Sequence, residues 1–393
     1  MPFFERWRED VNRKEYLSVD FLPAPIVCPP ETLNIFKPFW FHRHIPKLAK
    51  NECQAFIDRF YECGKNIVGG KNETQTEQLL TFVLRYIANL ITRPAYKSKV
   101  CLVFYGVQGS GKSLFWDIVG KMIGNNYYSV ISNPEKVFDK FNSSGANKFL
   151  AVLNEFPLDG KKYADVMKDK ITEEYDWLEL KGKDPVKVRN NTNYVILTNH
   201  SNCVKVEDTD RRYMICQTGP KQSDDFYKPL YESKDNKDYI YHLLHDVMQR
   251  VKLPETGYNF LANIPASFEK QALKELNYHP RVHFLQHLYE SATDKTKNIT
   301  KSSDDLYAEY KAFREANGYK ADSLETKVSF GVNLKNDKEL TEVIKMKHTR
   351  TGNMKEIVMT ALKVYIDKKF PADVCPEEDK EEETTQPIEN DDE

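Results

Sequence analysis

A glycine-rich turn between an apolar run and a helix-like segment constrains the fold more than any other feature. The stretch CLVFYGVQGSGKSLF, residues 101–115, contains the pattern G-x-x-x-x-G-K-[ST]. Residues 102–105 have the composition of a buried strand, and 114–123 have that of a helix. Similar alternation of short apolar runs and helical patterns continues to about residue 219. The sequence therefore predicts an α/β core with a mainly parallel sheet.

The turn also has the chemistry of a phosphate-binding loop. Glycines let successive backbone N–H groups curl around phosphate oxygens, and a helix N-terminus favours negative charge. Lys112 would reach the β- and γ-phosphates of ATP, and Ser113 would ligate Mg²⁺. A flexible turn that matches by chance is the alternative. We expect ATP and Mg²⁺ as cofactors, with ATP bound by Gly106, Val107, Gln108, Gly109, Ser110, Gly111, Lys112 and Ser113.

Hydrolysis of ATP requires an acidic residue at the end of a neighbouring strand. The segment KFLAVLNEF ends an apolar run in Asn154 and Glu155. We expect Glu155 to be the catalytic base and, with Ser113, to hold the metal. Asn154 stands where many P-loop enzymes carry Asp, so water and Ser113 would hold magnesium more than a direct carboxylate. A capping or surface acid is the alternative for Glu155.

A third apolar run, YVILTNH, ends in Asn199. An amide at this place can orient water or contact the γ-phosphate, which would make Asn199 part of the catalytic group. Asparagine after a strand is also common as a simple turn residue. The neighbouring runs favour the catalytic interpretation.

Arg211 lies just before a fourth strand-like run, in the segment VEDTDRRYMICQTG. An arginine near the γ-phosphate stabilises the charge of the transition state and is often supplied by a neighbouring subunit. We therefore expect Arg211 to be catalytic and the protein to form a homo-oligomer. The alternative for Arg211 and Arg212 is an ion pair with Asp208 or Asp210.

Composition excludes several classes of protein. The 393 residues are 40% hydrophobic and 30% charged, which is typical of a soluble chain with two or three domains. The apolar runs are too short to span a bilayer and the N-terminus is too charged for a signal peptide, so we expect no membrane or export role. The seven cysteines include no C-x-x-C pair, which favours a reducing compartment.

Charge is unevenly distributed along the chain. The net charge is −2, but residues 373–393 hold eleven acidic side chains and one lysine, so the rest of the chain is basic. The predicted parts are a helical, oligomerising region (1–95), the P-loop core (96–220), a helical appendage (221–298), a winged-helix-like domain (299–370) and an acidic disordered tail (371–393).

The winged-helix-like assignment rests on two helix patterns followed by a hairpin pattern. Residues 306–317 and 327–335 have helical spacing, with Ser303 as the expected cap, and the runs IKMKHT and MKEIVMTAL flank a turn. Basic residues gather on this wing and would contact DNA or dock another replication protein. They are Lys345, Lys347, His348, Arg350 and Lys355.

The order of the P-loop, LNEF, YVILTNH and DRRY resembles the superfamily 3 helicases of viruses and mobile elements. It is most similar to the helicase half of the poxvirus-type primase-helicases, over residues 1–300 and more weakly to about 370. The resemblance implies an α/β fold with a P-loop AAA+-like sheet core, flanked by an N-terminal helical region and a C-terminal winged-helix-like domain. Such proteins are ring hexamers that translocate on single-stranded DNA, usually 3′→5′.

The resemblance also implies where DNA binds. The segment WLELKGKDPVKVRNN, residues 177–191, has the alternation of a β-hairpin with a basic tip. Its cations suit non-specific contact with a phosphate backbone. A solvated surface hairpin is the alternative. The expected DNA-binding residues are Lys181, Lys183, Lys187 and Arg189.

These observations predict an ATP-dependent replicative DNA helicase of a virus or mobile element. It would act on single-stranded or forked DNA as a ring, with a primase domain or other replication proteins as further partners. It would work in the host cytoplasm or nucleus or at a viral replication site. The alternatives are an initiator or loader ATPase without processive unwinding and a nucleotide-dependent assembly scaffold.

Overall fold

A computed structural model describes eleven segments of the chain, which are 3–133, 147–155, 161–178, 184–200, 210–255, 257–267, 270–271, 275, 278–319, 324–349 and 352–371. The chain divides into two compact units, residues 1–274 and 275–393. The first unit ends inside the predicted helical appendage, 221–298.

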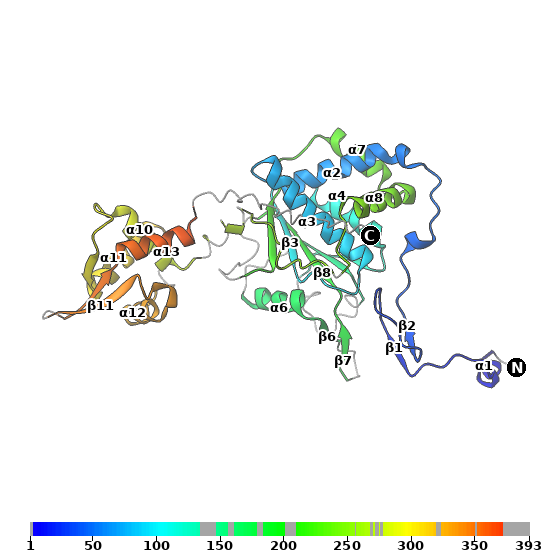
Figure 1. The fold of residues 1–393 in the computed structure, drawn as a ribbon, viewed down its shortest axis with the longest axis horizontal. Helices are drawn as coiled ribbons and strands as arrows, with labels where there is room; N and C mark the ends of the chain where they lie inside the picture. Colours follow the sequence, from blue (N-terminus) through cyan, green and yellow to red (C-terminus); the bar gives the residue numbers. More distant parts are fainter. Residues whose placement is uncertain are drawn as a thin grey trace, which may run out of the picture. The chain divides into compact units, whose positions relative to one another are not determined.

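A five-stranded parallel sheet lies at the centre of the first unit (Figure 1). Four of its strands are apolar and almost wholly buried, as in a sheet covered by helices on both faces. The predicted α/β class with a parallel sheet is confirmed. In spatial order the strands are β4 (Tyr128–Ile131), β5 (Leu150–Asn154), β8 (Asn193–Thr198), β3 (Cys101–Tyr105) and β9 (Tyr213–Gln217).

Helices cover the two faces of the sheet unequally (Figure 1). On one face, α2 (Gln54–Val68), α3 (Glu73–Thr92), α4 (Lys112–Ile123) and α8 (Lys237–Arg250) form the main core with the sheet. On the other face, Met167 and Ile171 of α6 (Lys161–Thr172) pack against the strands. Within the described ranges, no helix is long and apolar enough to cross a bilayer.

The N-terminal segment becomes helical later than its sequence pattern indicates. It contains α1 (Phe3–Glu9), the parallel pair β1 (Ser18–Asp20) and β2 (Thr32–Asn34), and the short 3-10 helices η1 (Trp40–Arg43) and η2 (Lys50–Cys53). A helix pattern begins near Lys47. However, α2 begins only at Gln54, and Lys47 and Leu48 instead donate their backbone N–H groups to Asp238 of α8.

The second unit combines helices with a small antiparallel sheet. Its strands follow the order β10-β12-β11, and β11 and β12 form the hairpin that the sequence predicts. Its elements are α10 (Pro280–Ser291), β10 (Ile299–Ser302), α11 (Ser303–Ala316), α12 (Lys327–Asn336), η5 (Lys338–Leu340), β11 (Ile344–Thr349), β12 (Gly352–Ile357) and α13 (Met359–Lys369).

Two local predictions for this unit are wrong. The cap of α11 is Ser302, whose side chain accepts the Asp305 N–H, and Ser303 is the first helical residue. The second strand also stops at Ile357, because the following residues MTAL open α13. Its Met359 and Leu362 then pack into the core of the unit.

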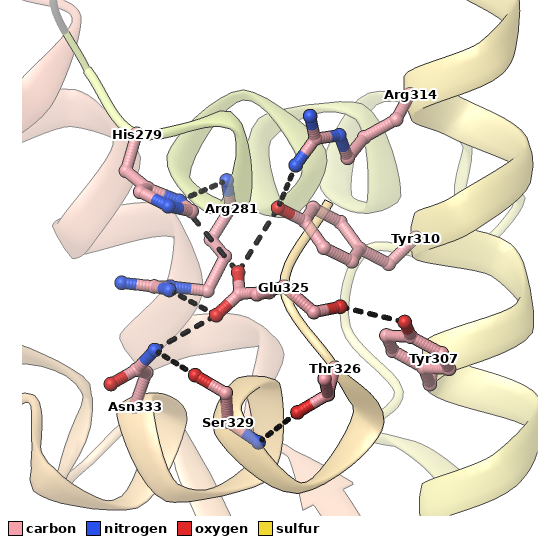
Figure 2. A network of polar contacts seen from close by, with 9 residues as sticks. All are labelled: His279, Arg281, Tyr307, Tyr310, Arg314, Glu325, Thr326, Ser329 and Asn333. Carbon is pink, nitrogen blue, oxygen red and sulfur yellow. Dashed lines mark hydrogen bonds and ion pairs between the residues drawn. The ribbon is translucent and has the colours of Figure 1, made fainter. Parts of the chain in front are cut away.

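A buried carboxylate joins three helices of the second unit, as Figure 2 shows. Glu325 precedes α12 and receives hydrogen bonds from Arg281 of α10 at 2.6 Å, Asn333 of α12 at 2.8 Å and Tyr310 of α11 at 3.1 Å. The backbone carbonyl of Glu325 accepts a further bond from Tyr307 at 2.7 Å. All four donors therefore orient around one residue of a connecting segment.

Candidate nucleotide site and hairpin

The glycines of the phosphate loop occupy positions that other residues could not take without rearrangement. Gly106 follows β3 with φ +143°, and a Cβ there would lie 2.3 Å from Thr218 Oγ1. Gly111 caps α4 with φ +93°, and its Cβ would lie 2.8 Å from the Tyr227 ring and 2.9 Å from Cys63 Sγ. The loop is therefore held tightly between the end of β9, α2 and α7 (Asp224–Ser233).

Lys112 lies at the first position of α4 with its ammonium folded back over the loop. Its Nζ donates to the carbonyl oxygens of Gly106 and Val107, both at 2.9 Å, and to Ser110 Oγ at 3.2 Å. Burial lowers the pKa of Lys112, while the nearby Glu155 carboxylate raises it. A buried cation with only neutral hydrogen-bond partners attracts an anionic ligand.

Glu155 and Asn199 meet this lysine at the carboxyl edge of the sheet. Asn199 follows β8, which lies between β3 and β5, and its Oδ1 is 3.4 Å from Lys112 Nζ. Its Nδ2 donates to Glu155 Oε1 at 2.8 Å. The three side chains thus form one hydrogen-bonded series. Glu155 itself has φ +51°, a conformation rare outside glycine and common at functional sites.

A cavity of about 450 Å³ opens beside these residues. Its wall includes Asn154, Glu155 and Asn199 as well as the loop from Gln108 to Ser113. Gly106 and Val107 are not part of the wall and contribute carbonyl groups to Lys112 instead. The structure thus brings together all the predicted nucleotide-site residues except Arg211.

Two tyrosines of α7 also line this cavity, and sequence reasoning missed them. Tyr227 packs against the loop beside Gly111, and Tyr231 lies one turn further with 58% of its surface exposed. Their spacing of four residues places them on one helix face. That spacing was visible in the sequence, but only the fold directs this face toward the loop.

The donor set fits a nucleoside triphosphate with Mg²⁺. It offers the N-terminus of a 12-residue helix, a buried ammonium, the exposed Ser113 hydroxyl and the exposed Glu155 carboxylate. Among the described residues, no group of three or more His, Cys, Asp or Glu side chains could hold a metal ion. Magnesium would therefore need phosphate oxygens and water to complete its ligands.

Arg211 lies at the amino ends of the parallel strands, whereas the phosphate loop lies at their carboxyl ends. It is exposed and precedes β9, whereas the loop follows β3, and the two strands run parallel. A five-residue strand is about 17 Å long, so Arg211 is far from its own loop. No ion pair joins Arg211 to another described residue, although Asp208 is outside that set. Arg212 is 3.5 Å from the buried Asp210 carboxylate.

The predicted hairpin exists, and aromatic residues share a face with its cations. Strands β6 (Tyr175–Leu178) and β7 (Val186–Arg189) pair antiparallel, with Tyr175 opposite Arg189 and Trp177 opposite Lys187. Alternation places these four side chains on one face. Trp177 is 63% exposed and Tyr175 is 43% exposed. The other two predicted cations, Lys181 and Lys183, lie outside the described residues.

The cations of this face lie against an aromatic ring. Lys187 Nζ is 4.4 Å from the centre of the Tyr175 ring, and the Arg189 guanidinium is 5.3 Å from it. Arg189 also donates to the Tyr175 hydroxyl at 3.3 Å. In the sequence, Trp177 is only one position of the alternating hairpin pattern. Its high exposure, which the sequence did not reveal, makes it a candidate contact residue.

A half-buried lysine fixes the helix that precedes the hairpin. Lys97 donates to the carbonyl oxygens of Lys170 at 2.7 Å and Glu173 at 3.0 Å, at the end of α6. Burial lowers the pKa of Lys97 to about 7. Lys97 lies just before β3. These bonds therefore tie the end of α6, where the chain enters the hairpin, to the central sheet.

The basic cluster on the predicted wing is largely neutralised or buried. Lys347 pairs with Glu356 at 2.6 Å, and Lys345 pairs with Glu342 at 3.5 Å. Lys355 is only 5% exposed. Arg350 and the His348 side chain lie outside the described residues. The described part of the wing therefore presents little free positive charge.

A sequence comparison and a comparison of structures find the same phage protein as a relative. Residues 104–212 match a family of unknown function (DUF5906). The chain is 30% identical over 128 residues to the DNA primase-polymerase of Nitratiruptor phage NrS-1, an alignment that covers 31% of this chain and only 18% of the phage protein.

Solved structures of that relative extend the likeness to most of the chain. The apo structure of the NrS-1 C-terminal region matches with a TM-score of 0.60 at 16% identity, covering 87% of this chain and 84% of that one. An A-form apo structure of the region matches with a TM-score of 0.60 at 17% identity, covering 89% and 86%. The protein therefore shares the fold of the NrS-1 C-terminal region.

Proposed function

We propose that this chain is the ATPase motor of a viral or mobile-element DNA replication protein. The observation that carries the proposal is the hydrogen-bonded series of Lys112, Asn199 and Glu155 at the carboxyl edge of β3, β8 and β5. It supplies a cation for phosphate, an amide and a carboxylate beside one cavity. The similarity to a phage DNA primase-polymerase supports a place in replication.

Each residue has a distinct chemical role in this proposal. The loop N–H groups and Lys112 bind and orient the phosphates of ATP. Glu155 accepts a proton from the attacking water, and Asn199 holds the carboxylate in position while sensing the γ-phosphate. ATP would supply the phosphoanhydride bond, Mg²⁺ would supply positive charge beside its phosphate oxygens, and Ser113 would hold the metal.

Strand separation is the activity that we propose for the motor. The aromatic and cationic face of the β6–β7 hairpin has the two features of a single-strand binding surface, which are rings for base stacking and charges for phosphates. We propose a superfamily 3-type helicase of the poxvirus-like branch, AAA+-related, hexameric and moving 3′→5′. The second unit would be a winged-helix domain, and a primase domain would be a partner.

A paired assay tests the proposal. Glu155→Gln should bind ATP normally, because its Oε1 still accepts the Asn199 amide, but should lose hydrolysis and forked-duplex unwinding by at least about 100-fold. Glu232→Gln, an exposed position on α7, is the matched control and should behave as wild type. Retained hydrolysis in Glu155→Gln would mean that another group is the base.

Wild-type behaviour in the same assay separates helicase from loader. Hydrolysis with strand displacement on a forked duplex supports the helicase. Hydrolysis without displacement, at any loading time, would favour an initiator or loader ATPase.

A further inference from the structure

A second cavity, larger than the one at the phosphate loop, lies at the other end of α4. Its volume is about 860 Å³. Helix α4 starts at the phosphate loop and is about 18 Å long, so the two sites are separate. Three stretches of the first unit form its wall, which are residues 37–43, residues 121–127 and the junction of α7 with α8.

The wall of this cavity is strongly basic. Five cationic side chains and one carboxylate contribute to it. Lys121 pairs with that carboxylate, Asp235, at 2.5 Å, and Lys234 pairs with Asp117 at 2.6 Å. The other three, Lys37, Arg43 and Lys237, have no ion pair with any described carboxylate.

Contacts on both sides hold the basic stretch 37–43 in place. The backbone N–H of Lys37 donates to the Tyr127 hydroxyl at 3.0 Å, and that hydroxyl donates to the Lys37 carbonyl at 2.6 Å. At the other end, His44 bonds to Asp238 of α8 at 2.7 Å. The cavity is therefore already shaped before a ligand arrives, which reduces the entropic cost of binding.

Trp40 forms an apolar wall and occupies two carbonyl groups that would otherwise repel an anion. Its indole N–H lies 3.0 Å from the carbonyl oxygens of both Lys121 and Met122, which are acceptors at the negative end of α4. Lys237 lies 5.7 Å from the Trp40 ring and is the first residue of α8, whose N-terminus favours negative charge. Apolar Phe39, Ile123 and Ile240 complete the lining.

We infer that this cavity binds a phosphorylated ligand with an apolar or aromatic body, namely a nucleotide. Unpaired cations around an aromatic and aliphatic lining match phosphate and base respectively. The nucleotide is either free or one unit of a nucleic acid strand, and the chemistry of recognition is the same in both cases. The inference does not depend on hydrolysis at the phosphate loop.

Charge reversal tests the cavity in the full chain. The variant combines Lys37→Glu with Lys237→Glu, and the control combines Lys14→Glu with Lys252→Glu, two exposed lysines of the same unit without an ion pair to described residues. Calorimetric titration with ATP counts nucleotide sites per chain. Fluorescence anisotropy with labelled oligothymidylate, at two salt concentrations, measures strand binding. Lys112→Ala removes the phosphate-loop site independently.

Two results support the inference and identify the source of the phosphate. A free nucleotide is the ligand if wild type binds two ATP per chain, Lys112→Ala retains one, and the Lys37/Lys237 variant loses the other. A strand is the ligand if the Lys37/Lys237 variant binds oligothymidylate at least about tenfold more weakly, with a salt slope lower by about 2, while ATP stoichiometry is unchanged.

Two other results overturn it. If the Lys37/Lys237 variant binds both probes as wild type does, the cavity is not a nucleotide-binding site. If the control variant loses binding equally, the loss comes from overall charge and not from the cavity. Thermal unfolding of both variants near the wild-type temperature excludes misfolding. Arg43→Glu, which alters an exposed side chain of the same wall, gives an independent measurement with the same expected direction.

Discussion

Asn199 connects the lysine and the acid of the candidate site, because one amide group contacts both. Its Oδ1 faces Lys112 and its Nδ2 donates to Glu155. An amide is suited to this place, since it can accept from an ammonium and donate to a carboxylate at once. The amide carries its acceptor and its donor on separate atoms, so both contacts form at the same time. The residue therefore aligns the two groups that bind and hydrolyse ATP in our proposal.

Asn199→Ala should lower the rate of ATP hydrolysis about 100-fold while leaving ATP affinity within a few-fold of wild type. The physical reason is that Lys112 and the loop still bind phosphate, but Glu155 is no longer oriented. Steady-state phosphate release and equilibrium ATP binding measure the two effects. The control is Asn51→Ala at an exposed position in the same unit. Hydrolysis within twofold of wild type would reduce Asn199 to a turn residue.

At the scale of elements, one face of the β6–β7 hairpin carries exposed aromatic rings and cations, and their proposed roles in base stacking and phosphate contact can be tested separately. Trp177→Ala should weaken binding of single-stranded DNA by about 1–3 kcal/mol without changing its salt slope, because stacking releases no counterions. Lys187→Ala should reduce the salt slope by about 1. Anisotropy titrations at several salt concentrations resolve both effects.

The other face of the hairpin provides the control for this prediction. Val186 is 50% exposed and alternates away from Trp177 and Lys187. Val186→Ala should therefore leave DNA affinity unchanged. Basal ATP hydrolysis should also be unaffected in all three variants, since none of the described hairpin residues lines the nucleotide cavity. Equal affinity of wild type and Trp177→Ala would assign the face to an ordinary surface.

Glu325 holds three helices of the second unit together through hydrogen bonds, as an apolar core side chain does through packing. Its side chain is 9% exposed and contacts three helices (Figure 2). Glu325→Ala should destabilise this unit by about 3 kcal/mol, because Arg281 would keep a partly buried charge without its partner. Denaturant unfolding followed by tyrosine or circular dichroism signals measures this loss. Glu315→Ala, at an exposed pair with Lys311, should change stability by less than about 0.5 kcal/mol.

At the scale of the whole molecule, the position of Arg211 bears on the homo-oligomer that we propose. Arg211 and the phosphate loop lie at opposite edges of one parallel sheet, so a single chain cannot bring them together. In a ring of identical subunits, the Arg211 edge of one chain can face the loop of the next. We therefore expect each ATP site to contain residues of two subunits.

Mixing two inactive variants tests this arrangement. Arg211→Ala and Lys112→Ala should each abolish hydrolysis, and a mixture should recover part of it, because some interfaces then carry both native residues. The recovered rate should depend on the ratio of subunits, and differently tagged chains must show that exchange occurs. With exchange demonstrated, an absence of recovery at every ratio would exclude Arg211 as the residue that acts between subunits. Arg212→Ala mixed in the same way provides the comparison.

The sequence by itself determined the features that depend on local chemistry. The phosphate loop was predictable because its glycines and Lys112 must occur at fixed spacing between a strand and a helix. The apolar strands of the parallel sheet were predictable because both of their faces are buried. Glu155 and Asn199 were found for a related reason, since each directly follows such a strand.

Tertiary structure alone decided which of these groups meet and which surfaces stay open. Asn199 contacts Lys112 and Glu155 because β8 lies between β3 and β5, an order set by long-range packing. The exposure of Trp177 and the turn of Tyr231 toward the loop depend on how α6 and α7 dock. Lys37 and Lys237 are about 200 residues apart in sequence and share a cavity only in the folded chain. Local patterns carry no information about such pairs, because burial and proximity depend on the whole fold.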